Sequence, residues 1–347
     1  MPFVKKKKIR VFHGLVNYGT QAGILAQSLR EHSISALSVA GYDRYKRLID
    51  VELYSGKSIT KRFFNWVRLF TYFFKFNIFH FYFGTSLFPS QMDLPFYRMF
   101  GKKIVMHYLG NDVQGYKKSV EKYKWTNMPE YIGNGNSVLH DSRIQRRLAF
   151  ELKYTDLAFV CAPLYSEFVP SSKVLPLAID LNKYAYTVSP YNKVLEIMHA
   201  PTHKGFKGTS YIVNAIGKLI AEGYPVKLNL VENITHDQLK EEYKKCDIFI
   251  DQILSGWYGT ASLEAMATGR PVICSIRKSY FKYISYGDEI PIIHADPDCI
   301  YDSILYLIKN REMLPEIGIA SREFVEKVHD HNKIVVDLIQ EYKNLYL

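Results

Sequence analysis

The stretch Gly256-Trp-Tyr-Gly-Thr-Ala-Ser-Leu-Glu264-Ala-Met-Ala-Thr-Gly-Arg-Pro-Val-Ile273 indicates how this chain folds. A glycine-containing loop leads into a short helix, Gly269 ends that helix, and Pro271 begins an apolar strand. The first N–H groups of a helix lack intrahelical partners and lie at the positive end of its dipole, so this helix start is a candidate phosphate site. Glu264, one turn further in, is placed to accept hydrogen bonds from a pair of sugar hydroxyls. An ordinary loop, helix and strand without a ligand is the alternative for this stretch alone.

A second segment with similar organisation lies about sixty residues earlier. Val194 to His199 reads as a strand, residues 200–209 as a basic loop, and residues 210–220 as an amphipathic helix. The loop carries Lys204 and Lys207, three residues apart. Two ammonium groups just ahead of a helix start suit a diphosphate, because they add charge to the N–H donors. For either lysine alone, a solvated loop with no ligand is the alternative.

Several motifs in the second half of the chain are familiar in their order and spacing. They are His199-Ala-Pro, Lys207-Gly-Thr, Asp247-Ile-Phe-Ile-Asp251-Gln, Tyr258-Gly and Glu264-Ala-Met-Ala-Thr-Gly-Arg-Pro-Val. Together with Ile78–Gly84, Gly101–Asp112, Asp156–Pro163 and Val174–Asp180, they resemble glycosyltransferase family 4. The resemblance covers nearly the whole chain.

The resemblance implies an α/β protein of the GT-B fold, with two Rossmann-like, doubly wound parallel-sheet domains facing a central cleft. The alternation of predicted strands and helices along the chain independently favours parallel α/β sheets. We expect an acceptor-binding domain over residues 1–188 and a nucleotide-sugar-binding domain over 189–330. The helix predicted near the C-terminus, within 331–347, is expected to cross back to the first domain.

The resemblance also assigns candidate site residues. Those expected to bind the donor are Lys204, Lys207, Tyr258, Gly259, Thr260, Ala261 and Glu264. From the first domain, Gly19 and Thr20 are expected in a loop lining the cleft, and His107 follows an apolar strand where the family has a group beside the reacting centre. His107 is therefore the catalytic candidate, with a purely structural histidine as the alternative. Asp112 is expected to be a turn or cap residue.

The chain departs from the family pattern at one position. The family's Glu-x7-Glu signature would place its first glutamate eight residues before Glu264, where this chain has Gly256. The ribose-binding role of the second glutamate is therefore transferred to Glu264. In the family, the first glutamate contacts the donor sugar. In this chain that contact must come from another group, and backbone groups or Asp251 are the candidates.

A metal site is not expected. Asp296-Pro-Asp298 matches the Asp-x-Asp motif of metal-dependent glycosyltransferases, but it also precedes an apolar helical pattern. An aspartate followed by proline is typical of an N-cap and the first helical residue, and we favour that interpretation. The expected mechanism is metal-independent and uses no cofactor besides the nucleotide-sugar donor, with lysines and helix ends stabilising the leaving diphosphate.

Composition is that of an ordinary globular protein, with 48% hydrophobic and 23% charged residues in 347. The four cysteines, at positions 161, 246, 274 and 299, have no metal-ligand spacing, so we expect small buried residues in a reducing compartment.

No signal peptide is predicted, because the apolar run Ile9–Leu15 is too short. Lys75, Asn77 and His80 argue against a membrane span over residues 69–88. A cytoplasmic protein is expected.

Positive charge is concentrated near the N-terminus: residues 1–75 contain fourteen Lys/Arg and four Asp/Glu. On a helix, Lys61, Asn65, Arg68, Tyr72 and Lys75 would form one largely basic stripe beside Phe, Trp and Val side chains. This pattern favours an interfacial helix over residues 61–75 on an anionic membrane, at the inner face of the plasma membrane. A helix packed on the sheet with a basic outer stripe is the alternative. No nucleic-acid recognition motif is present, and no nucleic-acid partner is expected.

These observations predict an enzyme, a hexosyl- or related glycosyltransferase. It would move a sugar from a UDP- or GDP-sugar to a cell-envelope, lipid-linked or other glycan acceptor in polysaccharide biosynthesis. The family resemblance implies retention of anomeric configuration. Two alternatives are open: a non-hydrolysing sugar-nucleotide epimerase of the same fold, and a catalytically inactive nucleotide-sugar-binding subunit.

Overall fold

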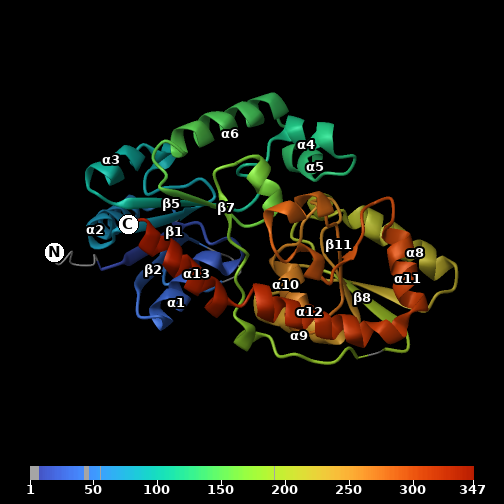
Figure 1. Ribbon diagram of the computed structural model, residues 1–347. Coiled ribbons are helices and arrows are strands. Elements are labelled where there is room, and N and C mark those ends of the chain that lie inside the picture. The colour runs from blue at the N-terminus through green and yellow to red at the C-terminus, as the bar shows by residue number, and fades with distance from the viewer. Residues whose placement is uncertain (1–7, 43–46, 55, 191) are drawn as a thin grey trace. The chain divides into compact units, whose positions relative to one another are not determined.

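The computed structural model describes residues 8–42, 47–54, 56–190 and 192–347 (Figure 1). The chain divides into two compact units, one within Met1–Val113, Arg143–Ala178 and His331–Leu347, the other within Gln114–Ser142 and Ile179–Asp330. The ranges predicted from the sequence, 1–188 and 189–330, differ from these units in two places. Residues 114–142 pack with the second unit, and the chain passes into that unit after Ala178. The C-terminal residues 331–347 belong to the first unit.

The first unit is built on a seven-stranded parallel sheet with the strand order β3-β2-β1-β4-β5-β6-β7. Its strands are β1 (Arg10–Leu15), β2 (Ser35–Gly41), β3 (Val51–Leu53), β4 (Ile78–Tyr82), β5 (Lys103–Tyr108), β6 (Leu157–Val160) and β7 (Lys173–Val174). The order reverses beside β1, as in doubly wound sheets whose ligands bind at the carboxyl ends of the strands. The central strands are buried on both faces, which explains their continuous apolar sequences.

Helices cover both faces of this sheet. They are α1 (Gln21–Glu31), α2 (Ile59–Lys75), α3 (Leu94–Met99) and α13 (His331–Asn344), while α6 (Ser137–Glu151) begins in one unit and ends in the other. On one face, Leu29 of α1 and Leu338 of α13 pack with Val11 and Val105. The α13 ribbon, in red, runs beside the blue α1 in Figure 1. On the other face, Leu69 of α2 packs in a second core cluster with strand residues that include Phe12 and Phe79.

The second unit contains a five-stranded parallel sheet with the order β12-β11-β10-β8-β9. Its strands are β8 (Leu195–His199), β9 (Val226–Leu230), β10 (Ile248–Ile250), β11 (Val272–Cys274) and β12 (Ile293–His294). Its helices are α4 (Tyr116–Lys122), α5 (Met128–Ile132), α7 (Lys204–Lys207), α8 (Thr209–Ala221), α9 (His236–Lys245), α10 (Thr260–Ala267), α11 (Ile300–Lys309) and α12 (Leu314–Val328). One face packs on α8 and α11, and Phe249 on the other face contacts Tyr243 of α9.

Short 3-10 helices connect these elements: Tyr18–Thr20, Pro89–Gln91, Pro163–Glu167, Leu181–Lys183, Lys278–Tyr283, Gly287–Glu289 and Arg311–Met313. The predicted pair of parallel α/β sheets is confirmed. Between β5 and α6 the chain forms the short helices α4 and α5. Among the described residues, no helix combines the length and apolar character needed to cross a membrane, and Ile78–Tyr82 is a buried strand. All four cysteines are free; three are buried and Cys299 is partly exposed.

Candidate functional site

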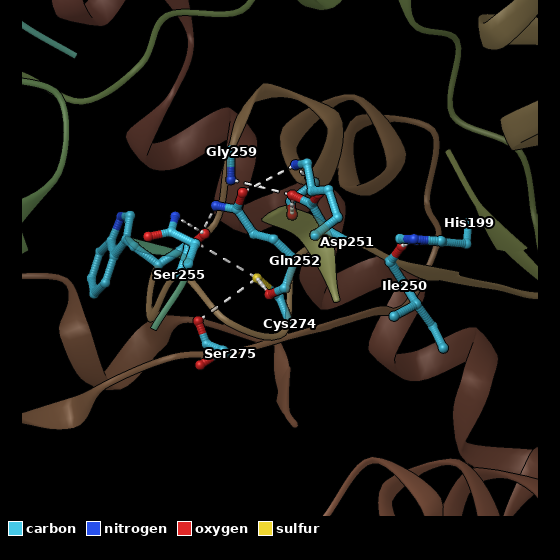
Figure 2. Close-up of polar contacts among 12 residues, drawn as sticks. His199, Ile250, Asp251, Gln252, Ser255, Gly259, Cys274 and Ser275 are labelled. Atoms are coloured by element: carbon cyan, nitrogen blue, oxygen red, sulfur yellow. Dashed lines mark hydrogen bonds and ion pairs between the residues drawn. The ribbon is translucent and has the colours of Figure 1, made fainter. Parts of the chain in front are cut away.

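The first basic segment begins where β8 ends. His199, the last residue of β8, is buried, and its Nδ1 lies 2.8 Å from the carbonyl oxygen of Ile250 on β10 (Figure 2). Its Nε2 lies 2.9 Å from the hydroxyl of Thr209, the first residue of α8. Burial lowers the pKa of His199 to about 4, so the ring is neutral. The histidine thereby ties the start of α8 to the ends of two strands.

Lys207 is the last residue of α7, a short helix inside the predicted loop 200–209, and it forms a nearly buried ion pair. Its Nζ is 2.6 Å from Oδ1 of Asp251 and 3.0 Å from Oε1 of Gln252. The Asp251 side chain is 2% exposed and that of Lys207 14%. Burial acts to raise the pKa of Asp251, but the Lys207 ammonium and the surrounding hydrogen bonds outweigh it and lower that pKa. An ammonium has three N–H donors, and the two contacts here leave a third for a ligand.

The same carboxylate holds the start of α10. Oδ2 of Asp251 accepts a 2.6 Å hydrogen bond from the Ser262 hydroxyl and a 3.3 Å bond from the Gly259 N–H. Figure 2 shows Asp251 and Gly259 facing each other across this contact. No side chain of the described residues caps α10, and Thr260 and Ala261 in its first turn are partly exposed. The lysine loop and the helix start are thus joined through one buried aspartate.

The loop between β10 and α10 is fixed by further hydrogen bonds. The side-chain Nε2 of Gln252 donates to the Trp257 carbonyl at 2.6 Å, and the main-chain carbonyl of Gln252 accepts from the Ser275 N–H at 3.0 Å. The Cys274 thiol lies 3.1 Å from the same carbonyl (Figure 2). The loop therefore has a defined conformation between two strand ends.

Glu264 lies on α10, with its side chain partly buried. Its Oε1 is 2.8 Å from Nε2 of His236, and its Oε2 accepts from the Tyr243 hydroxyl at 3.3 Å. Both partners belong to α9, so α9 and α10 are linked by this carboxylate. Lys204, by contrast, is exposed and pairs with Glu232 at 2.9 Å.

Tyr258 is almost completely buried. Its hydroxyl lies 3.0 Å from Nε2 of His329, and its ring stacks on Trp257 with centroids 5.0 Å apart. The side chain therefore stabilises the interior of the second unit. A donor contact from this position would come from the main chain.

Gly256 has a backbone conformation that disfavours the family's glutamate. Its φ is +79°, and a Cβ at this position would lie 2.5 Å from the guanidinium of Arg277. That guanidinium donates to the Trp125 carbonyl at 2.6 Å and lies 3.8 Å from the centroid of the Tyr123 ring. An arginine thus occupies the space beside Gly256 and connects the loop to residues 114–142 of the same unit.

Asp251 was one candidate for the missing sugar contact. Both of its oxygens are engaged by Lys207, Ser262 and Gly259, and it is buried. Its position therefore suits the support of Lys207 and α10 rather than direct contact with a sugar.

In the first unit, Gly19 and Thr20 follow β1 and directly precede α1. Both have left-handed conformations, with φ values of +51° and +68°. The Gly19 carbonyl accepts from the Gln21 side chain at 3.1 Å, and both residues are partly exposed. The left-handed conformation at a non-glycine residue is uncommon and marks this turn as a site of local strain.

His107 lies inside the first sheet, with its residue 1% exposed. Its Nδ1 is 3.3 Å from Nε2 of His80, whose Nδ1 is 2.6 Å from the Tyr342 hydroxyl of α13. His13 on β1 stacks on His80 and lies 2.6 Å from the Tyr82 hydroxyl. Burial lowers the pKa of both His13 and His107 to about 3. This burial among neutral histidines gives the catalytic role of His107 no support.

The Asp-x-Asp motif serves other contacts. Asp298 binds Lys124 and the Trp125 indole at 2.7 to 2.8 Å. The helix that follows, α11, begins at Ile300 and not at Pro297, so the predicted N-cap at Asp296 is wrong. The Asp296 side chain accepts from the Asp298 N–H at 2.9 Å in the turn before α11. The Asp296 carbonyl accepts from the Cys299 N–H at 3.1 Å and from the Ile300 N–H at 2.9 Å, so residues 296–299 form the turn that leads into α11.

Within the described ranges, His294, Asp296 and Cys299 have ligand atoms that lie within 4.8 Å of one another. The Nδ1 of His294 accepts the Ile276 N–H at 3.0 Å. The neutral ring then carries its proton on Nε2, the nitrogen nearer Asp296, and offers no lone pair there. The three residues therefore do not form a prepared metal site.

Sequence reasoning missed His236, Tyr243, Ser262 and Arg277. The first two contact Glu264 through tertiary packing of α9 on α10, which no local pattern reveals. Ser262 lies two residues after Thr260, the first residue of α10, and its hydroxyl could have been expected to bond to a nearby carboxylate. The position of Arg277 depends on the course of the chain after β11.

Comparison with known proteins agrees with this architecture. Sucrose-phosphate synthase from Thermosynechococcus elongatus is similar in structure, with a TM-score of 0.65 and 14% identity over 98% of this chain and 99% of that one. Anabaena Alr3699/HepE, solved with UDP-glucose, has a TM-score of 0.62 and 12% identity over 95% and 99%. WaaG, a glycosyltransferase involved in lipopolysaccharide biosynthesis, has a TM-score of 0.57 and 12% identity over 95% and 98%.

No curated protein matches the sequence significantly. The two parallel-sheet α/β domains have the GT-B fold. Residues 216–324, which include Asp251, Gly259 and Glu264, match the family described as glycosyl transferases group 1.

Proposed function

We propose that this protein is a glycosyltransferase that takes its sugar from a nucleotide diphosphate donor, UDP- or GDP-linked, bound by the second unit. The observation that carries the proposal is the connection of Lys207 and the start of α10 through the hydrogen bonds of the Asp251 carboxylate. The family match over residues 216–324 supports it. So does the UDP-glucose bound by the similar Anabaena protein.

In this proposal Lys207 binds the diphosphate. Asp251 holds the ammonium in place, and the third N–H is available for a phosphate oxygen. The N–H groups of Thr260 and Ala261, in the first turn of α10, add donors at the positive end of a helix. As the glycosidic bond breaks, negative charge grows on the diphosphate, and a cation and N–H groups already in place stabilise it. Lys204 is exposed and would contribute less.

Glu264 is proposed to bind the ribose of the donor. Its two oxygens already accept from His236 and Tyr243, which fixes the carboxylate in orientation. Each carboxylate oxygen has a second lone pair and can accept from a ribose hydroxyl as well. Glu264 is thus a binding residue in this scheme, and its hydrogen-bond partners position it.

The finer features are also proposals: hexosyl transfer with retention, no metal requirement, and a cell-envelope or other glycan acceptor. Metal independence is supported by the engagement of Asp298 with Lys124 and Trp125. His107 is retained as a catalytic candidate only through the family resemblance. A role for Gly19 and Thr20 is supported by their place after β1, at the carboxyl edge of the first sheet. A cytoplasmic location remains part of the proposal.

The proposal is tested by titration calorimetry with UDP and GDP, followed by NMR of UDP- and GDP-sugars incubated with the protein and a glycan acceptor. Binding of one nucleotide and appearance of a new glycosidic anomeric signal are expected. Glu264→Gln should raise the donor KM and retain turnover, since an amide keeps part of the hydrogen bonding. A general base replaced in this way would lose about 10²–10⁴-fold in kcat.

Three other outcomes have distinct meanings. Binding of neither nucleotide contradicts the donor site. Conversion of the donor into an epimeric sugar nucleotide, without acceptor, identifies the epimerase. Binding of a nucleotide sugar without turnover on any acceptor tested identifies an inactive binding subunit. The glycine at position 256, where the family has a glutamate, would then account for the lack of activity.

A further inference from the structure

A row of aromatic side chains remains exposed along α2. Phe63, Trp66, Phe70 and Phe74 are spaced by three and four residues, so they lie on one side of the helix. Leu69 is the only buried residue of α2, which therefore packs on the first unit by another side. The row is not part of the core, although aromatic residues are usually buried when a helix covers a sheet.

A second segment extends this surface. The rings of Trp66 and Phe88 are 4.9 Å apart between centroids, and those of Phe74 and Phe100 are 6.2 Å apart. We call Phe63, Trp66, Phe70, Phe74, Phe88 and Phe100 the aromatic face; their exposed fractions range from 39% to 65%. The neighbouring helix α3 adds Met99, which is 76% exposed. Both helices belong to the first unit, where Figure 1 draws α2 and α3 near the N-terminal strands. Exposed aromatic rings that contact one another across two segments are typical of an interaction site.

The segments that carry the aromatic face have exposed charge of one sign. Residues 53–111 contain eight Lys/Arg and a single acidic residue, Asp93. Asp93 is buried and accepts hydrogen bonds from Ser86, Tyr97 and the Leu87 N–H. It therefore contributes no acidic surface. Exposed Lys61, Arg68 and Lys75 recur every seven residues along α2, and Arg98 is exposed on α3.

We propose that the aromatic face docks on an anionic lipid surface, with its rings at the headgroup boundary and its basic residues on lipid phosphates. The combination of aromatic side chains with long cationic ones is typical of interfacial helices. A second copy of this chain fits less well, because pairing the same face would bring like charges together. The proposed donor site lies in the second unit, whereas the membrane-binding face lies in the first and includes the segment 88–100 besides residues 61–75.

Co-sedimentation with vesicles tests the proposal. The full chain is mixed with vesicles of phosphatidylcholine alone, and with vesicles that also contain phosphatidylglycerol. Binding is expected only to the second kind, and to weaken when salt is raised from about 0.1 to about 1 M, which shortens the Debye length from about 10 to about 3 Å. Arg68→Gln should lower the partition coefficient about fivefold, since a basic residue near an anionic bilayer contributes about 1 kcal/mol.

Substitutions of exposed rings test the apolar part. Phe70→Ser and Met99→Ser should each lower the partition coefficient about tenfold, the first on α2 and the second on α3. Tyr306→Ser, a half-exposed ring on α11 in the second unit, is the matched control and should leave binding unchanged. Nucleotide affinity is measured on every variant, so that loss of folding or failure of the donor site is distinguished from loss of membrane binding.

Equal binding to both kinds of vesicle, or binding to neither, overturns the proposal. An effect of Phe70→Ser without any effect of Met99→Ser overturns the two-segment face. If the protein instead forms a dimer by light scattering, and Phe70→Ser abolishes that dimer, the occupant of the face is a second copy and not a membrane.

Discussion

The ion pair between Lys207 and Asp251 provides a quantitative test of the site's construction. Lys207→Met keeps an apolar stem of similar length but removes the ammonium from an aspartate that is 2% exposed. Asp251 then retains only the bonds from Ser262 and Gly259. Breaking a buried pair in this way costs about 3–5 kcal/mol, because an uncompensated charge remains. Since water can reach the lysine end of the pair, we expect a loss of about 3 kcal/mol.

Neutralising the aspartate should restore much of that stability. In the double variant Lys207→Met/Asp251→Asn, the amide oxygen can still accept from Ser262, and no buried charge is left. We therefore expect the double variant to be more stable than Lys207→Met by about 2 kcal/mol, an interaction energy in the range found for contacting residues. The asparagine variant alone, whose lysine keeps its bond to Gln252, should lose about 1–2 kcal/mol.

The measurement is urea unfolding followed by the fluorescence of Trp257, which lies buried in the same loop, with the other two tryptophans replaced by phenylalanine. The destabilisation caused by Lys207→Met should shrink as pH falls from about 7 to about 4. The Asp251 pKa is lowered in the intact pair, so the pair's stabilisation is present above the unfolded pKa of 3.8 and is lost as pH falls through the folded value. Without Lys207 the buried carboxyl takes up a proton at higher pH and removes the unpaired charge.

Two results would refute this reasoning. If Lys207→Met changed the free energy of unfolding by less than about 0.5 kcal/mol, the pair would be solvated in a way that the structure does not show. If the double variant were no more stable than the single one, the penalty would not come from the unpaired charge. The double variant also separates folding from function, because it should fold and still bind UDP or GDP more weakly, by about 1.5–3 kcal/mol, the scale of a charge-assisted hydrogen bond.

Two further predictions concern Gly256 and His107. Gly256→Glu should destabilise the protein by about 2–4 kcal/mol without restoring a sugar contact, because the φ of +79° at this position strains any side chain and Arg277 fills the space. The control is Gly217→Ala, where a Cβ meets nothing within 4 Å. Equal melting temperatures of the two variants would contradict the prediction. Burial lowers the pKa of His107 from its ordinary 6.5 to about 3, so the stability that the neutral ring contributes is present above pH 6.5 and is lost as pH falls toward 3. His107→Phe removes this titration. The free energy of unfolding, followed by the fluorescence of Trp66, should then depend less steeply on pH, by about 1.4 kcal/mol per pH unit between about pH 6 and 4. An NMR titration midpoint of His107 near 6.5 would exclude this effect.

The sequence was sufficient for the order and type of most elements. Apolar runs such as Ile78–Tyr82 and Lys103–Tyr108 bury both faces of a parallel strand, so their composition identifies them without tertiary information. Strand ends and helix starts follow from glycine and proline positions around Gly256–Ile273. The segment 114–142 was less predictable, because its short helices lack a complete apolar period and depend on contacts such as that of Asn127 with Ser255.

By itself, the sequence therefore determined two parallel α/β sheets, a basic loop carrying Lys207, and a helix start at Thr260, since these depend on periodicity, charge and backbone preference within short segments. Tertiary structure decided which groups meet. It buried His107 beside His80, paired Lys207 with Asp251 across 44 positions, and placed Arg277 against Gly256. The physical reason is that the pKa, the exposure and the free donors of a side chain depend on neighbours brought together by the sheets, and these neighbours are distant in the chain.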